Sequence, residues 1–109
     1  MEFVFSYGTL QRSEVQLKLF GRSLRGWEDK LEGYKTAEIE IDDQLFLARC
    51  EGTRQLTAVV SSGDAISGMA FEITQDELEM IDQYEPRNYK RFSVTLHSGK
   101  QAWIYLKVG

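Results

Sequence analysis

Hydrophobic and polar residues alternate over several short stretches of the chain, as expected for half-buried β-strands. The alternation is clear over residues 37–41 and again near the C-terminus, where residues 92–96 and 102–106 flank Ser98-Gly99. Two alternating stretches around such a turn predict a β-hairpin. Residues 3–5, in contrast, are all apolar. A short run that is apolar on both faces predicts a central strand.

The segment between Leu24 and Val60 is expected to hold short strands separated by polar turns. Beyond the stretches already named, we expect strands at residues 45–47, 56–60 and 68–73, and turns at 42–43 and 51–52. Most neighbouring strands are close enough in the sequence to pair locally, and strands outnumber helices. The pattern therefore predicts the α+β class, with one domain over residues 1–109 whose sheet is curled or closed into a small barrel.

Two segments carry the signals of helix ends. A short helix is expected from about Glu14 to Phe20, because Ser13 and Gln16 have the spacing of a capping box and Gly21 is a typical C-terminal stop. A second helix is expected after Thr74, where Glu77 completes another capping box. We expect it to end near Tyr84, because Pro86 disfavours helical geometry at the residue before it.

Composition limits the chemistry that is available. The 109 residues include one cysteine and one histidine, so no internal disulfide and no Cys/His zinc site can form. The net charge of -4 argues against a surface built to bind nucleic acid, and no apolar run approaches the ~20 residues that span a bilayer. We therefore expect a cytoplasmic protein whose chemistry uses carboxylates, hydroxyls and backbone amides.

The turn formed by Tyr7, Gly8, Thr9 and Leu10 is the first candidate site. A buried strand that stops at a glycine and enters a helix leaves several backbone N–H groups unpaired at one place, and these amides suit an anion. Thr9 adds a hydroxyl. The same residues also fit a plain strand-to-helix turn. The chain lacks the Gly-Lys-Ser/Thr and GxGxxG patterns, which disfavours nucleotide binding.

The carboxylate of Glu85 is the second candidate. Leu78, Ile81 and Glu85 follow the i, i+3, i+7 spacing of one helix face, so Glu85 would extend an apolar stripe. A carboxylate that points into an apolar cavity has a raised pKa and can transfer protons near neutral pH. In the alternative, Glu85 is solvated and pairs with Arg87 or Arg91. Trp103 and Tyr105 share one face of the last strand and could line a cavity.

These residues, taken in order, resemble the gamma-glutamylcyclotransferase-like family, also called AIG2-like. The resemblance rests on Phe5-Ser-Tyr-Gly-Thr-Leu-Gln11, Leu31-x-Gly33-Tyr34, Gly68-Met-Ala-Phe71, Leu78-x-x-Ile81-Asp82-x-Tyr84-Glu85, Tyr89-x-Arg91 and Ala102-Trp103-Ile104-Tyr105. It covers essentially the whole chain. The sequence differs from many members after the first block, at Gln11-Arg12-Ser13, and at Pro86, where glycine is usual.

The resemblance implies a small mixed β-barrel with flanking helices. It also implies an enzyme that cleaves a γ-glutamyl amide into 5-oxoproline and a free amine, without metal or cofactor. Glu85 would then be the catalytic acid–base. The turn of Tyr7, Gly8, Thr9 and Leu10 would bind the γ-glutamyl head group, with Tyr105 in the pocket wall.

Two other functions remain open at this stage. The differences at Gln11-Arg12-Ser13 and Pro86 are compatible with a non-catalytic module that binds a small carboxylate on the same fold. A third possibility is an interaction protein with a degenerate cavity. The expected partner is a small γ-glutamyl molecule, with no nucleic acid and no membrane, and the sequence does not determine the oligomeric state.

Overall fold

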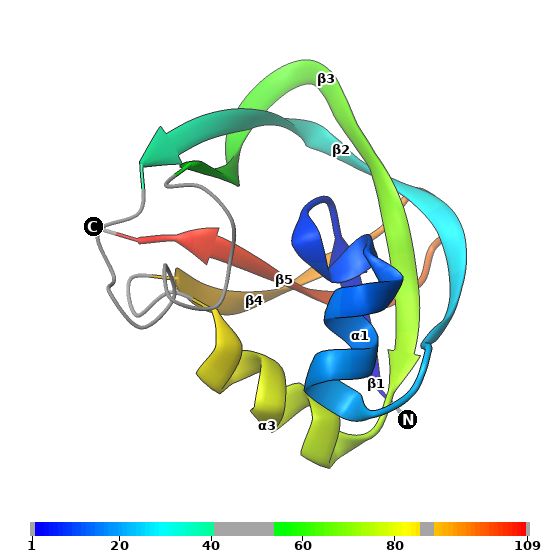
Figure 1. Ribbon diagram of the computed structural model, residues 1–109. Coiled ribbons are helices and arrows are strands. Elements are labelled where there is room, and N and C mark those ends of the chain that lie inside the picture. Colours follow the sequence, from blue (N-terminus) through cyan, green and yellow to red (C-terminus); the bar gives the residue numbers. More distant parts are fainter. Residues whose placement is uncertain (1, 41–53, 86–88, 109) are drawn as a thin grey trace.

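The computed structural model describes residues 2–40, 54–85 and 89–108 (Figure 1). The elements, in chain order, are β1 (Glu2–Ser6), the 3-10 turn η1 (Thr9–Gln11), α1 (Ser13–Phe20), β2 (Arg25–Glu40), β3 (Arg54–Ile73), α3 (Gln75–Tyr84), β4 (Tyr89–Thr95) and β5 (Gln101–Lys107). Among these residues, no helix is both long enough and apolar enough to cross a bilayer.

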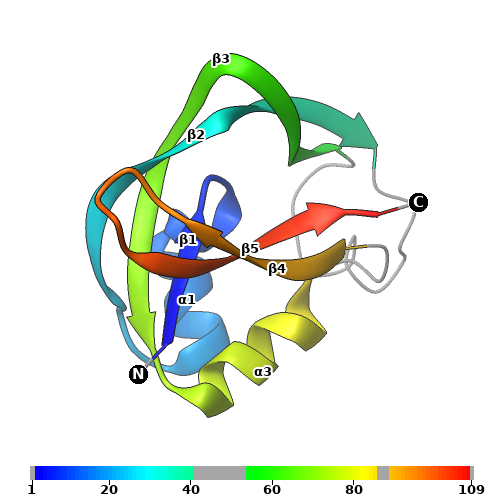
Figure 2. The ribbon, with the colours of Figure 1, turned by 180° about the vertical axis from the view of Figure 1, so that it is seen from behind.

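The five strands form one mixed sheet in the order β2-β3-β1-β5-β4. Strand β1 is central and carries the apolar run at residues 3–5, which confirms that prediction. It pairs antiparallel with β3 and parallel with β5, whereas β4 and β5 form the antiparallel hairpin expected around Ser98-Gly99. Figure 2 shows this hairpin and the β2–β3 pair on opposite sides of β1.

Strands β2 and β3 are far longer than the sequence predicts. They extend over 16 and 20 residues, so the expected strands at 56–60 and 68–73 belong to a single strand, and treating them as separate was wrong. The pairing register shifts where Glu32 pairs with Ala65 and Tyr34 pairs with Val60. Gly33 adopts a positive φ of 84° at this irregularity, a conformation that glycine tolerates. The predicted strand at 45–47 and the turns at 42–43 and 51–52 lie outside the described residues.

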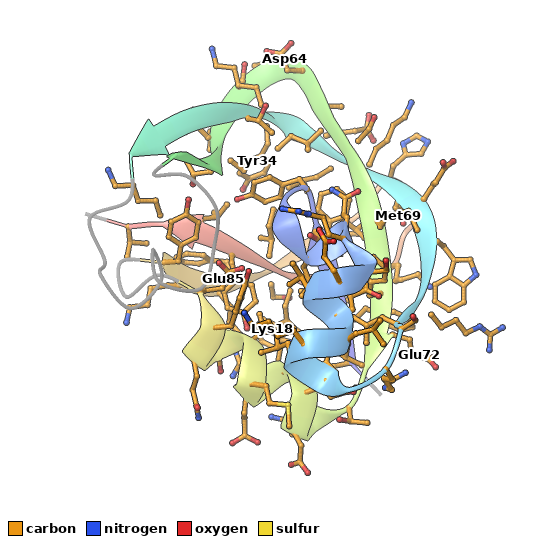
Figure 3. All side chains as sticks on the ribbon, in the orientation of Figure 1. Lys18, Tyr34, Asp64, Met69, Glu72 and Glu85 are labelled. Carbon is orange, nitrogen blue, oxygen red and sulfur yellow. The ribbon has the colours of Figure 1, made fainter. Side chains whose placement is uncertain are left out.

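The sheet is strongly curved, and β3 and β5, the two strands that flank β1, approach each other beyond its end. The Thr57 hydroxyl, near the start of β3, accepts a 3.0 Å hydrogen bond from the Lys107 backbone N–H at the end of β5. Tyr34 of β2 points into the hollow of the curve (Figure 3) and packs against the core there. The described sheet has β2 and β4 as its edges, so closure into a barrel stays a prediction.

The two helices confirm one capping prediction and contradict the other. Thr74 and Glu77 form the expected capping box at α3, with bonds of 2.9 and 3.1 Å. The Ser13–Gln16 box is wrong, because Arg12 is the N-cap of α1 and makes no side-chain capping bond. Gln16 is buried instead, and its carboxamide bonds the Leu10 carbonyl and the Leu24 N–H. Gln16 therefore makes tertiary hydrogen bonds and does not cap α1.

Apolar side chains fill both faces of the sheet. One cluster lies between the sheet and the helices and includes Leu10, Leu78, Ile81, Tyr84, Tyr89 and Tyr105. The other fills the hollow of the curve and includes Phe5, Leu31, Ala58, Ile66, Ala70 and Ile104. Both helices lie on the side of the first cluster (Figure 1). Burial on both faces explains why β1 has no polar alternation.

Candidate active site

Because β1 and β5 are parallel, their C-terminal ends lie at the same edge of the sheet. Tyr7 directly follows β1, and Tyr105 is near the end of β5. The Tyr7 hydroxyl donates a 2.7 Å hydrogen bond to the Tyr105 backbone carbonyl. The topology therefore brings together two residues that the sequence separates by almost the whole chain.

The turn after β1 is tight and closely packed. The Gln11 N–H donates to the Gly8 carbonyl at 3.2 Å, which closes the 3-10 turn, while Leu10 is buried in the core. The amides of Thr9 and Leu10 come before this first internal bond, in the position where helical N–H groups lack intrahelical acceptors. Gly68 of β3 packs against the turn, and a Cβ there would lie 2.4 Å from the Ser6 carbonyl oxygen.

Glu85 ends α3 at the position next to this edge. It is the C-cap residue, with an extended backbone, and its N–H still donates to the Ile81 carbonyl at 3.0 Å. Leu78 and Ile81 are fully buried, as the apolar stripe predicts, and Glu85 is partly buried. Burial raises the pKa of Glu85 to about 8. Figure 3 shows its side chain between the end of α3 and β5 in this view.

Three tyrosines lie close enough to Glu85 for its charge to act on their hydroxyl groups. Burial raises the pKa of Tyr7, Tyr89 and Tyr105, and the negative charge of Glu85 raises all three pKa values further. A hydrogen bond with Thr57 opposes this rise in the pKa of Tyr7 and Tyr89. The carboxyl group therefore lies in a desolvated region near hydroxyl groups from β3, β4, β5 and the turn after β1.

The sequence offered an ion pair between Arg91 and Glu85 as an alternative, but in the structure Arg91 pairs with Asp82 instead. The Arg91 guanidinium lies 3.5 Å from Asp82 and stacks over Trp103, 4.8 Å from the ring centroid. Asp82 also accepts a 2.6 Å hydrogen bond from the Tyr105 hydroxyl. Arg87 lies outside the described residues.

Of the residues expected from the sequence, Glu85, Tyr7 and Tyr105 come together, and Gly8 and Leu10 adjoin them through the turn. The side chain of Thr9 is outside the description. Sequence reasoning did not assign roles to Tyr89, Thr57 or Asp82. Thr57 had one signal, since it is a polar position within the apolar stretch 56–60.

The cavity expected around Glu85 stays a prediction. Surface hollows lined by described residues occur between α1 and α3, beside the β4–β5 turn, and next to Trp103. Glu85 does not line any of these three. In the described part of the chain, no group of three or more His, Cys, Asp or Glu side chains is placed to hold a metal ion.

Solved structures share this fold over nearly the entire chain. A protein titled "Gamma-glutamyl cyclotransferase" has a TM-score of 0.77 and 16% identity, covering 99% of this chain and 67% of its own. An Arabidopsis thaliana protein solved in solution has a TM-score of 0.75 and 19% identity, covering 98% of this chain and 62% of its own. An uncharacterized protein of Pyrococcus horikoshii has a TM-score of 0.65 and 21% identity, covering 98% and 78%.

These neighbours define the class as an α+β protein with the fold of γ-glutamyl cyclotransferases. Residues 4–109 match the sequence profile of the family described as "Gamma-glutamyl cyclotransferase, AIG2-like", and the chain belongs to that family. The resemblance recognised in the sequence is therefore confirmed. No curated protein sequence matches the chain. The chain covers 62% to 78% of the length of the three solved relatives, and identities near 20% establish the fold alone.

Proposed function

We propose that the protein is a γ-glutamyl cyclotransferase in which Glu85 is the catalytic acid–base. The observation that supports this most directly is the Glu85 carboxyl, whose pKa burial raises to about 8, beside the hydroxyl-rich cluster of Tyr7, Tyr89 and Tyr105. Perturbed carboxyl groups of this kind are common at catalytic sites. Membership of the family gives the reaction class.

The raised pKa of Glu85 fits the first proton transfer of this reaction. An α-amino group has an ordinary pKa of about 8, and it must lose a proton before its nitrogen can attack. A solvated glutamate, with a pKa near 4.3, would accept that proton at a cost of about 5 kcal/mol. A carboxylate with a pKa of about 8 accepts it at almost no cost.

The reaction then proceeds within one bound molecule. Glu85 takes a proton from the α-ammonium group, and the neutral nitrogen attacks the γ-carbonyl carbon. The bond from the tetrahedral carbon to the leaving nitrogen breaks as this nitrogen receives the proton from Glu85. The ring nitrogen loses its second proton, which the released amine takes up. The products are 5-oxoproline and a free amine. Holding the amine against the carbonyl in a near-attack geometry gives an intramolecular cyclisation most of its acceleration.

The turn after β1 is proposed to bind the γ-glutamyl head group. The backbone amides of Gly8, Thr9 and Leu10 suit its α-carboxylate, because consecutive N–H groups at a glycine-containing turn form an anion site. Tyr105 is proposed as part of the wall that faces the substrate.

The test is release of 5-oxoproline from a panel of γ-glutamyl compounds that includes γ-glutamyl amines and small γ-glutamyl peptides. We expect turnover by the wild type and a loss of at least about a hundredfold in kcat for Glu85→Gln, within the usual range for removing a general base. Glu79→Gln is the matched control, an exposed carboxylate on the same helix. Absence of product from every compound, or equal turnover by Glu85→Gln, would contradict the proposal.

A non-catalytic module for a small carboxylate is the second candidate. The observation in its favour is again the pKa of Glu85, because a carboxyl group with a pKa of about 8 is mostly protonated at pH 7 and can donate to a ligand carboxylate. Thermal stabilisation by 5-oxoproline or glutamate, without product from any γ-glutamyl compound, would favour this function.

A further inference from the structure

The proton of the Tyr105 hydroxyl is directed away from Glu85. This hydroxyl donates at 2.6 Å to an Asp82 carboxylate oxygen and lies 3.3 Å from the Leu78 carbonyl, and both of these acceptors belong to α3. A phenol has a single proton, and the shorter contact to a charged oxygen is the stronger bond. Among the residues that the structure describes, none donates to the Tyr105 hydroxyl oxygen, so its remaining lone pairs can accept.

Tyr7 is not available in the same way. Its proton is committed to the Tyr105 backbone carbonyl at 2.7 Å, and its oxygen is hydrogen-bonded by Thr57 and by the Ala58 backbone. Asp82 and Glu85 are three residues apart on the last turn of α3, a spacing that places side chains on one helix face. The Tyr105 hydroxyl, bonded to Asp82, therefore lies beside Glu85. The negative charge of Glu85 also acts on both tyrosines.

The oriented Tyr105 oxygen and the Glu85 carboxylate together make a site for a cation with several N–H donors. An ammonium group offers three donors and no acceptor, which matches this set. When Glu85 is ionised, a ligand group that lacks N–H or O–H donors would leave these acceptors unpaired. This inference rests on the proposed function, in which the substrate carries an α-ammonium group.

We propose that Asp82 is a positioning residue. It accepts the Tyr105 hydroxyl proton and thereby fixes Tyr105 as a hydrogen-bond acceptor for the α-ammonium group of the substrate, beside Glu85. Arg91 lies 3.5 Å from the second Asp82 oxygen and stacks over Trp103, so it places a positive charge beside this carboxylate without a hydrogen bond to it. Asp82 acts through Tyr105 and need not touch the substrate.

The experiment compares two ligands that differ only in the α-amino group. The first is the γ-glutamyl amide of the panel that the wild type turns over best, and the second is its glutaryl counterpart. The glutaryl compound has no amine, cannot cyclise, and acts as a competitive inhibitor. The variants are Asp82→Ala, Asp82→Asn and Tyr105→Phe. Asp76→Ala is the control, since Asp76 is exposed on the first turn of α3.

We expect Asp82→Ala to raise KM for the γ-glutamyl amide at least about tenfold, because a hydrogen bond to a charged group contributes about 1.5–3 kcal/mol. The Ki of the glutaryl compound should change less than about twofold. Asp82→Asn should largely restore KM, since its side-chain carbonyl still accepts the Tyr105 proton. In a Tyr105→Phe background, Asp82→Ala should have no further effect on the ratio of the two constants.

A different set of outcomes would overturn the proposal. If Asp82→Ala weakens the binding of both ligands equally, Asp82 only supports the local structure. If KM for the γ-glutamyl amide is unchanged, Tyr105 does not receive the ammonium group. If Asp82→Ala does not fold, Tyr105→Phe must still raise KM without changing the glutaryl Ki, or the proposal is wrong. If the wild type releases no 5-oxoproline from any compound, the proposed function itself fails, which is distinct from these results.

Discussion

The Tyr7 hydroxyl donates a 2.7 Å hydrogen bond to the backbone carbonyl of Tyr105, joining residues 98 positions apart in the sequence. The described pairing of β1 with β5 runs through Val4 and Trp103, so this bond extends the contact between the two strands beyond the end of β1. It places the turn after β1 against the strand that carries Tyr105. The geometry of the candidate site therefore depends on it.

Removing this hydroxyl should weaken both the fold and the reaction. Tyr7→Phe leaves the buried ring in place but deprives the Tyr105 carbonyl of its donor, so we expect a loss of about 1 kcal/mol in the free energy of unfolding. We also expect kcat/KM to fall at least about tenfold. Denaturant unfolding and 5-oxoproline release measure the two effects. Tyr34→Phe is the control, because Tyr34 of β2 points into the hollow of the curve and its variant also loses a tyrosine hydroxyl. Equal losses of stability and activity in the two variants would contradict the prediction.

The burial of Glu85 should make the protein less stable as the pH rises. The pKa of Glu85 is about 8 in the folded protein, against an ordinary value of 4.5. Between these values the folded state retains a proton that the unfolded chain releases, so the stability present below pH 4.5 is lost as the pH rises toward 8. Replacing Glu85 by glutamine removes this titration.

We therefore expect Glu85→Gln to be more stable than the wild type at pH 8, by up to about 5 kcal/mol, because each pKa unit corresponds to about 1.4 kcal/mol. The difference should shrink steadily as the pH is lowered to 4.5. Chemical denaturation of both proteins across this range measures it. Glu79→Gln should show no such trend. A difference that is independent of pH would show that Glu85 is solvated in the folded state.

The pKa of Glu85 should also set the acid limb of the pH–rate profile. If Glu85 accepts the α-ammonium proton, it must be ionised in the free enzyme, so kcat/KM should fall about tenfold for each pH unit below about 8. Steady-state rates from pH 5 to 9 measure this limb, and the residual activity of Glu85→Gln should lack it. A wild-type rate that stays level down to pH 5 would identify the base as an ordinary, solvated carboxylate or as another group.

Local signals in the sequence predicted the parts of the fold that depend on neighbouring residues. The apolar run at residues 3–5 and the capping box of Thr74 and Glu77 are present as expected. The length of β3 was not predictable in this way. The polar stretch of residues 61–64 has the composition of a turn, yet it continues the strand, because pairing with β2 continues on both sides of it. Residues 61–64 themselves have no partner in β2, and Gly63 has a positive φ of 87°, so the turn-like composition forms a local irregularity within the long strand.

The candidate site likewise combines a residue that a local sequence pattern indicates with contacts that only the tertiary fold creates. Glu85 became a candidate because it continues the spacing of Leu78 and Ile81, which is a local property of the helix, and the family resemblance then implied its catalytic role. The bond from Tyr105 to Asp82 was not recognised, since it joins β5 to α3 and leaves no periodic signal in the sequence. The position of Thr57 against Tyr7 and Tyr89 likewise follows from the curvature of the sheet.

The contribution of the capping box to the stability of α3 can be measured by comparing Thr74 with Ser13, because only Thr74 caps its helix. The Thr74 hydroxyl accepts from the Glu77 N–H at 3.1 Å, and Thr74→Ala leaves that donor without its partner. We expect a loss of about 1 kcal/mol in the free energy of unfolding, the usual cost of removing such a cap. Ser13→Ala is the matched control at α1, where Arg12 is the N-cap, and it should change stability by less than about 0.5 kcal/mol. Equal losses in the two variants would contradict this difference between the helices. Because α3 carries Glu85 at its other end, Thr74→Ala should leave KM unchanged when measured well below the melting temperature.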